Sequence, residues 1–257
     1  MLFRSPGSGQ HVGAHAHQLP DLDEGRAQFL ECEPDPLPRG ALGVFSADEP
    51  SAKAQGQVYL VQQIRETGTD IVVFSDFRHG MFNRDTVPAL TAAIPANTFR
   101  VADSQVASRW GNILEFSGFD LITPNEREAR FALGDQDSVV RPLGLELYRR
   151  AKCKTLMLKL GERGLMTFRA EPMSDEDVRS FFAIDSFAER VVDAVGSGDA
   201  LLAYATLALF ATKNSVIASV LGSLAAAIEC EHEGNVPVRP KDVVDKLHRF
   251  ERFMNYQ

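Results

Sequence analysis

From residue 51 onward, the chain alternates between short apolar runs and longer segments in which apolar positions recur at helical spacing. The short β-branched runs are typical of buried strands in a parallel sheet, and the longer segments are typical of helices that pack on it. Strands are predicted at residues 70–75, 98–103, 119–123, 155–161 and 164–168. Helices are predicted at residues 52–68, 84–94, 125–134, 142–152, 198–212, 214–232 and 240–254. This order predicts an α/β fold, a doubly wound and mostly parallel sheet with helices on both faces.

The first 50 residues do not follow this pattern. They are rich in Gly, Pro and polar residues, so we expect an irregular or poorly ordered segment at 1–50 and a single domain at 51–257. His11, His15 and His17 could form a metal cluster in this segment. Because no cysteine or carboxylate lies in the same run, a polar tail is the favoured interpretation.

Charge and cysteine content narrow the range of partners. The 257 residues carry a net charge of −8, which argues against a general nucleic-acid surface but leaves room for a small anionic ligand at a local site. The three cysteines form no CxxC pair, so reduced thiols in the cytoplasm are expected rather than a disulfide framework or a zinc cluster. No apolar run approaches the roughly 18 residues of a membrane span. A homodimer stays open.

The segment VVDAVGSGDALLAY, residues 191–204, places the strand-like pair Val191-Val192 before two glycines, two aspartates and a helical pattern. Glycines at the start of a helix allow backbone N–H groups to approach a ligand closely, and the positive end of the helix dipole favours a phosphate there. A carboxylate at the same place can act as a base. The alternative is a helix that Ser197 or Asp199 merely caps.

The segment TPNERE follows the predicted strand at 119–123 and places Asn125 and Glu128 on one helical face. An amide and a carboxylate beyond the carboxyl end of a strand could hold water-bound Mg²⁺. The same spacing is that of a capping box, with Asn125 as the N-cap. From this motif alone, the capping interpretation is favoured.

Two further polar clusters follow strands. In KLGERG, residues 159–164, the charged residues and glycines alone indicate a β-hairpin with a charged rim. In SDFRHG, residues 75–80, the side chains of Asp76, Arg78 and His79 follow a strand and could line a substrate pocket. His79 by itself is more often a hydrogen-bonded loop residue than a catalyst.

Taken in chain order, SDFRHG, TPNERE, KLGERG and DAVGSGDA resemble the motifs of the ribokinase-like (PfkB) carbohydrate kinases. The glycine motif resembles the family signature D-T-x-G-A-G-D, and TPNERE resembles the family motif N-x-x-E. SDFRHG and ITPNE are most similar to the heptose-phosphate kinase arm of the bifunctional ADP-heptose synthesis enzymes. The resemblance covers roughly residues 70–250. It implies a ribokinase-like fold and ATP-dependent phosphorylation of a hydroxyl on a sugar or sugar phosphate.

The resemblance also implies roles for the matching residues. Asp199 would be the base that takes the proton of the sugar hydroxyl. The amides of Gly196, Ser197 and Gly198 would form the anion hole for the transferred phosphoryl group. Positioning and charge stabilisation supply nearly all the catalysis in this chemistry.

Cofactor and substrate positions follow from the same resemblance. Asn125 and Glu128 would hold Mg²⁺ through water, and Asp193 would help to bind a monovalent cation such as K⁺. The positions that would border the nucleotide are Lys159, Gly161, Glu162, Gly164 and Ser223. The positions that would bind the substrate are Asp76 and Arg78.

The chain departs from the family in two informative ways. Ser223 stands where relatives often carry an asparagine on the adenine side. Only 75 residues precede Asp76, and no Gly-Gly pair occurs anywhere, so we expect the N-terminal sugar-binding turn and lid of the family to be missing. Two functions stay open: an active carbohydrate kinase, and a non-catalytic descendant that binds nucleotide as a regulatory or interaction subunit. The intact Asp199, Asn125 and Glu128 favour the kinase.

Overall fold

The computed structural model describes residues 2–3, 62, 64–65, 68–77, 82–105, 113–169 and 179–255. The chain forms two compact units, Met1–Gly111 and Asn112–Gln257, and each is described by itself. The predicted domain boundary near residue 50, most of the predicted helix at 52–68 and the three N-terminal histidines lie outside the described residues.

The first unit is built around a buried parallel strand pair. Its elements are β1 (Leu2–Phe3), β2 (Ile71–Asp76), α2 (Thr86–Ala93) and β3 (Phe99–Ser104). β2 runs parallel to β3 and antiparallel to β1. Pro88 lies in the first turn of α2, where its missing N–H breaks no helical hydrogen bond. The predictions of strands at 70–75 and 98–103 and of a helix at 84–94 are confirmed.

The second unit contains four strands among its described residues. In sheet order they are β4 (Leu121–Ile122), β5 (Thr155–Lys159), β6 (Leu165–Phe168) and β7 (Phe181–Ile184). β4 and β5 are parallel, whereas β6 is antiparallel to both β5 and β7. The helices are α3 (Glu126–Leu133), α4 (Val140–Ala151), α5 (Ser197–Thr212), α6 (Ser215–Cys230) and α7 (Pro240–Asn255). All five helices were predicted, but β7 was not.

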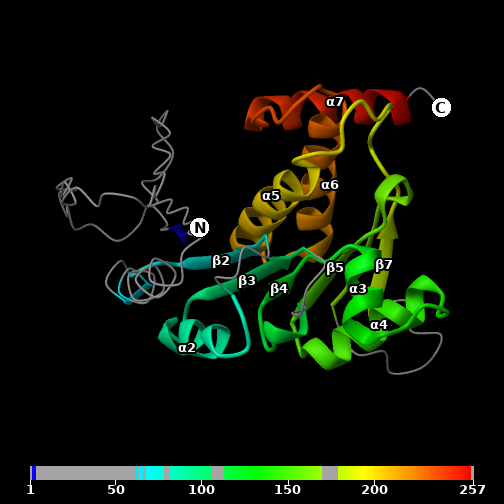
Figure 1. Cartoon of the computed structure of the whole chain (residues 1–257). Helices are drawn as coiled ribbons and strands as arrows, with labels where there is room; N and C mark the ends of the chain where they lie inside the picture. The colour runs from blue at the N-terminus through cyan, green and yellow to red at the C-terminus, as the bar shows by residue number, and fades with distance from the viewer. Residues whose placement is uncertain are drawn as a thin grey trace, which may run out of the picture. The chain divides into compact units, whose positions relative to one another are not determined.

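Helices cover both faces of the sheet in the second unit, with α3 and α4 on one face and α5 and α6 on the other (Figure 1). Phe168 of β6 faces α4, because a Cβ atom on Gly144 would collide with its ring. The preceding strand residue, Thr167, points to the opposite face, where its hydroxyl lies 2.8 Å from the hydroxyl of Ser219 on α6. The mixed sheet with helices on both faces confirms the predicted α/β fold class.

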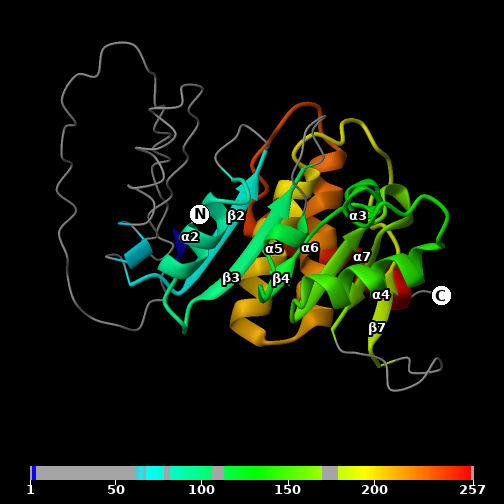
Figure 2. The same ribbon diagram turned by 60° about the horizontal axis from the view of Figure 1, so that its bottom comes forward.

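Helices α5 and α6 pack side by side, and α7 packs against α6 (Figures 1 and 2). The contact between α5 and α6 is close, since a Cβ atom on Gly222 would lie 3.0 Å from that of Ala205. On α7, the side chain of Lys246 is fully buried and pairs with Glu231 at 2.7 Å. The glycine motif lies at the start of α5.

None of the helices in the described part of the chain combines the length and the apolar character that a membrane crossing would require.

Candidate active site

Helix α5 begins in the glycine motif without a side-chain cap. Its N-cap is Gly196, with φ of 86°, and no side chain hydrogen-bonds to the helix start from this residue. The hydroxyl of Ser197 instead donates to the carbonyl of Ala194 at 2.8 Å. Asp199 lies exposed in the first turn. The alternative that Ser197 or Asp199 serves as the N-cap of this helix is therefore wrong, because the N-cap is a glycine and the N–H of Ser197 donates to the carbonyl of Ala194 at 3.3 Å.

A lysine from another motif lies beside this helix start. Gly198 is the second residue of α5, and a Cβ atom built on it would lie 3.4 Å from the Nζ atom of Lys159. The ammonium group of Lys159 is thus next to the positive end of the α5 dipole. Two positive features that converge in this way favour an anion between them.

Lys159 in turn joins the motif at the start of α3. It is the last residue of β5, its N–H donates to the carbonyl of Pro124 at 2.8 Å, and it forms an isolated parallel bridge with Asn125. The structure therefore brings together the motifs at residues 125–128, 159–164 and 193–199, which all belong to the second unit. They meet beyond the carboxyl ends of β4 and β5, where α/β sheets bind ligands.

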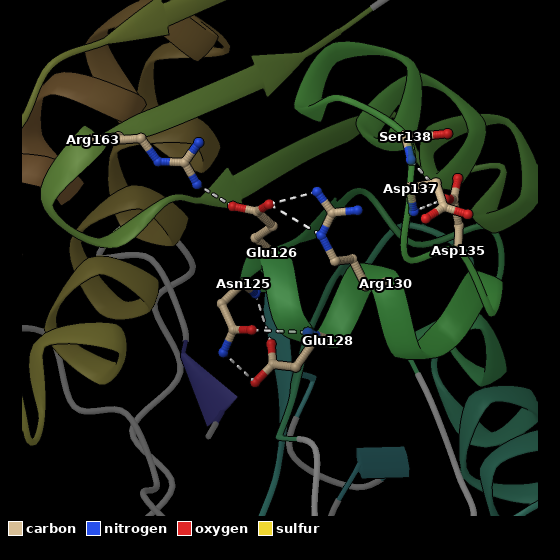
Figure 3. A network of polar contacts seen from close by, with 8 residues as sticks. All are labelled: Asn125, Glu126, Glu128, Arg130, Asp135, Asp137, Ser138 and Arg163. Carbon is tan, nitrogen blue, oxygen red and sulfur yellow. Dashed lines mark hydrogen bonds and ion pairs between the residues drawn. The ribbon is translucent and has the colours of Figure 1, made fainter.

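Asn125 and Glu128 form a capping box (Figure 3). The Asn125 side-chain oxygen accepts from the Glu128 N–H at 2.9 Å, and a Glu128 carboxylate oxygen accepts from the Asn125 N–H at 2.7 Å. The Asn125 amide also donates to the other Glu128 oxygen at 2.7 Å. The capping interpretation from the sequence is confirmed, and it holds the buried Glu128 carboxylate in one orientation.

This pair also meets the chemical requirement for a water-bound Mg²⁺ ion. Both side chains present oxygen, the ligand atom that Mg²⁺ prefers, and Mg²⁺ commonly keeps several of its waters. Among the described residues, no group of three or more His, Cys, Asp or Glu side chains could hold a metal directly. An ion at this place would therefore be held mainly through its waters, as the resemblance implies.

The KLGERG segment forms a tight turn between two antiparallel strands. β5 and β6 pair antiparallel, the turn contains a short 3₁₀ helix, η2 (Gly161–Arg163), and the N–H of Leu160 donates to the carbonyl of Gly164 at 2.9 Å. The hairpin interpretation is confirmed. Gly161 and Glu162 are exposed at the tip, so their predicted contact with a nucleotide stays a prediction.

An ion-pair network that the sequence did not reveal ties this turn to α3 (Figure 3). The Glu126 carboxylate pairs with Arg163 of η2 through one oxygen and with Arg130 of α3 through the other, at 2.7 Å from Arg130 Nη2. Hydrogen bonding from the Arg130 guanidinium, opposed in part by burial, holds the pKa of Glu126 below its usual value. The only local signal was the spacing of four residues between Glu126 and Arg130.

The loop before α5 corrects one expectation. Val191 and Val192 are not a strand: they are half-exposed, at 51% and 49%, in an irregular segment. Side chains this exposed, in a segment without regular structure, do not form the buried strand that the apolar pair suggested. The loop is held instead by the end of α6, because the N–H groups of Val192 and Asp193 both donate to the carbonyl of Cys230, at 2.7 and 3.2 Å.

The carboxylate of Asp193 organises the same loop. One of its oxygens accepts from the N–H of Val195 at 3.0 Å, and the other accepts from the N–H of Gly234 at 3.3 Å. Nearby, a Cβ atom on Gly196 would lie 2.6 Å from an oxygen of the buried Glu229. These contacts shape the turn that leads into α5, and a role of Asp193 at a monovalent cation stays a prediction.

Cys230 and Ser223 both lie on α6, the helix that packs against α5. The thiol of Cys230 is hydrogen-bonded to the Ser197 side chain, and burial raises its pKa despite this bond. Ser223 lies in the middle of α6 and is 7% exposed, and its hydroxyl finds no hydrogen-bond partner among the described residues. The predicted nucleotide contact of Ser223 is neither supported nor opposed by these observations.

The fourth motif, SDFRHG, belongs to the first unit. Asp76 ends β2, is 3% exposed and accepts a hydrogen bond from the Ser104 hydroxyl at 3.4 Å. Arg78 and His79 lie outside the described residues. The predicted substrate-binding roles of Asp76 and Arg78 stay predictions.

Comparisons with known proteins agree with the motifs. The pfkB family carbohydrate kinase profile matches residues 53–242. The bifunctional protein HldE of Pelobacter propionicus is 28% identical over 186 residues, which cover 70% of this chain and 36% of that protein. The chain spans about a third of the length of the curated relatives it matches.

Solved structures give the same result for the fold. Phosphofructokinase-2 from Escherichia coli in complex with potassium superposes with a TM-score of 0.63 at 16% identity, covering 83% of this chain and 67% of that one. The ribokinase of Arabidopsis thaliana complexed with ribose and ATP gives a TM-score of 0.57 at 20% identity, covering 73% and 58%. At these identities the likeness concerns the fold alone.

Proposed function

Because the chain belongs to the pfkB family of carbohydrate kinases, we propose that it transfers the terminal phosphoryl group of ATP to a hydroxyl of a sugar or sugar phosphate. The similarity to HldE proteins over their matched third and the SDFRHG and ITPNE segments favour a heptose phosphate as the acceptor. The observation that carries the proposal is the position of the Lys159 ammonium beside the uncapped first turn of α5.

In this proposal, the phosphates of ATP lie between Lys159 and the start of α5. The backbone N–H groups of Gly198 and its neighbours donate to the transferred phosphoryl group, and the ammonium of Lys159 balances its charge. These donors are fixed before the reaction, so they stabilise the transition state without reorganisation. The missing side chain of Gly198 leaves the space that a phosphate oxygen needs.

Asp199 is the proposed base. As the acceptor hydroxyl attacks the terminal phosphorus, its proton passes to the Asp199 carboxylate, the new oxygen–phosphorus bond forms, and the bond to the leaving ADP breaks. A base in this position contributes about 10²- to 10⁴-fold to the rate.

Asn125 and Glu128 are the residues that would hold Mg²⁺ through its waters. When bound, Mg²⁺ neutralises phosphate charge and orients the phosphates. Fixing Glu128 through its two hydrogen bonds with Asn125 keeps the carboxylate pointed in one direction before any ion arrives.

The test is turnover of ATP with Mg²⁺ and a panel of acceptors: heptose 7-phosphate, fructose 6-phosphate, ribose and fructose. The proposal expects ADP formation that depends on one acceptor, and a rise of the melting temperature with ATP and Mg²⁺. Saturation at a hundredfold excess over the dissociation constant corresponds to about 2.7 kcal/mol of stabilisation. Stabilisation by ATP with no acceptor turned over would favour the non-catalytic alternative. If ATP neither stabilises the protein nor is turned over, both functions are contradicted.

A further inference from the structure

We infer that Glu126 is a positioning residue for the nucleotide site: through Arg163, its carboxylate holds the turn at residues 160–164, and with it Lys159, against the start of α3. This inference rests on the proposed function, because it concerns the same site. Glu126 and Arg163 lie within the TPNERE and KLGERG segments, but the family resemblance implies no role for either residue. Both residues enter through the geometry in Figure 3.

The first step in the argument is how little else fixes the tip of this turn. Its backbone bonds are internal: the N–H of Leu160 donates to Gly164 at 2.9 Å, that of Gly164 to Gly161 at 3.0 Å, and that of Arg163 to Leu160 at 3.4 Å. Residues 161–163 are exposed. Among the described residues, the Arg163–Glu126 pair links this tip to another element through its side chains, and it spans 37 positions in the chain.

The second step is that Glu126 is itself held in place. Arg130, one helical turn later, contacts one carboxylate oxygen with Nε at 3.1 Å and with Nη2 at 2.7 Å. This fork fixes the rotamer of Glu126 and leaves the other oxygen directed at Arg163. At the first position of α3, the carboxylate also meets the favourable end of the helix dipole. Glu126 is therefore a fixed anchor, while Arg163, at 60% exposure, is the more mobile partner.

The third step is what the anchor positions. Lys159 lies four residues before Arg163 at the entrance of the same turn, and its backbone pairs with Asn125, the residue before Glu126. The ion pair and the backbone bridge therefore clamp the turn to α3 at two points. A shift of about 1 Å in a site of this kind can cost as much as about 10²-fold in rate, so a clamp that contributes little to stability can still matter for the site.

If Glu126 acted only through its charge, its loss would change ATP affinity in the opposite direction from the loss of a positioning residue. Replacing Glu126 with glutamine removes a negative charge near the place proposed for the ATP phosphates, which by itself strengthens ATP binding. If Glu126 acts by positioning, the same replacement weakens it. Arg163 is 60% exposed, and Glu126–Arg130 is an (i, i+4) pair within one helix. Pairs of these kinds contribute little to stability, so the melting temperature should change little in either case.

The experiment uses Glu126→Gln, Arg163→Met and the double variant in the full chain. The matched control is Glu146→Gln, which breaks a helical pair with Arg150 that also measures 2.7 Å. The first readout, amide hydrogen exchange at residues 160–164 without nucleotide, should accelerate roughly two- to fivefold in both single variants and not in the control. The second readout, calorimetric binding of ATP with Mg²⁺, should show a dissociation constant raised roughly three- to tenfold in each single variant, with no further rise in the double variant.

Each outcome decides something. Unchanged exchange at residues 160–164 in Glu126→Gln would overturn the inference, as would tighter ATP binding. Effects of Arg163→Met that are larger than those of Glu126→Gln and add to them would also overturn it, because Arg163 would then contact the nucleotide itself. If exchange accelerates but the parent chain binds no ATP, the clamp is supported and the proposed function is what fails.

Discussion

Replacing Gly198 with alanine should separate the stability of α5 from the function of its first turn. The nearest atom to the new Cβ outside the helix backbone would be Lys159 Nζ at 3.4 Å, an ordinary contact with the end of a flexible side chain. Alanine is also the better helix former, by up to about 1 kcal/mol. We therefore expect the free energy of unfolding to stay the same or rise by up to about 1 kcal/mol, which corresponds to at most about 2–4 °C in melting temperature.

The same methyl group should harm phosphoryl transfer. It would occupy the space between the α5 amides and the Lys159 ammonium, which the proposed mechanism gives to phosphate oxygens. Displacing the phosphoryl group from its donors should lower the rate about 10²-fold.

The assay is ADP formation with ATP, Mg²⁺ and the preferred acceptor, measured together with thermal unfolding. Gly222→Ala is the control, because its Cβ would press on Ala205 at 3.0 Å in the α5–α6 contact. It should lower the melting temperature and leave the rate per folded molecule unchanged. A Gly198→Ala variant that folds and keeps more than about a third of the parent rate would refute the reasoning, since the account requires about 10²-fold.

Three further predictions concern the neighbouring residues. Lys159→Met should raise the calorimetric dissociation constant for ATP with Mg²⁺ at least about tenfold, because a charged hydrogen bond to phosphate is lost. An unchanged dissociation constant would show that Lys159 does not contact the phosphates. Gly164→Ala should lower the free energy of unfolding in urea by more than about 2 kcal/mol, because φ is 84° and the new Cβ would overlap the carbonyl of Ile184. A cost under about 0.5 kcal/mol would contradict that geometry. The lowered pKa of Glu126 means that its ion pairs stabilise the fold above the ordinary glutamate pKa and are lost as the pH falls through the lowered one, so the difference in urea stability between the parent and Glu126→Gln should shrink between about pH 6 and about pH 3. A difference that grows on acidification would reverse the sign and reject the ion pairs as its cause.

The sequence predicted the elements of the fold that have strong periodicity. The helices at α3, α4, α5, α6 and α7 were predicted because each has an apolar pattern at helical spacing and most have a recognisable start or stop, such as Gly134 after α3. β7 was missed because Phe181–Ile184 is only four residues long and shows no alternation that favours a strand. Val191 and Val192 look like a strand in the sequence, but apolar letters form a strand only where the tertiary structure offers a partner.

The sequence identified the motifs of the candidate site but not the contacts that join them. Asn125 and Glu128 were identified because a capping box has a fixed local spacing. The contact of Lys159 with the start of α5 and the pair between Glu126 and Arg163 join residues that are 37 or more positions apart. No local pattern encodes such a contact. Only the packing of β5 beside β4 and of α5 over the sheet brings these residues together.

The measurement that tests the central claim most directly is phosphoryl transfer from ATP to the acceptor by the parent chain and by Asp199→Asn. Asparagine is nearly the same size as aspartate and costs the fold less than about 1 kcal/mol, but it cannot accept the hydroxyl proton. The account predicts a rate reduced about 10²- to 10⁴-fold, with an ATP dissociation constant that is unchanged or lower. No transfer by the parent to any acceptor of the panel, or an Asp199→Asn variant that keeps more than about a tenth of the rate, would contradict it.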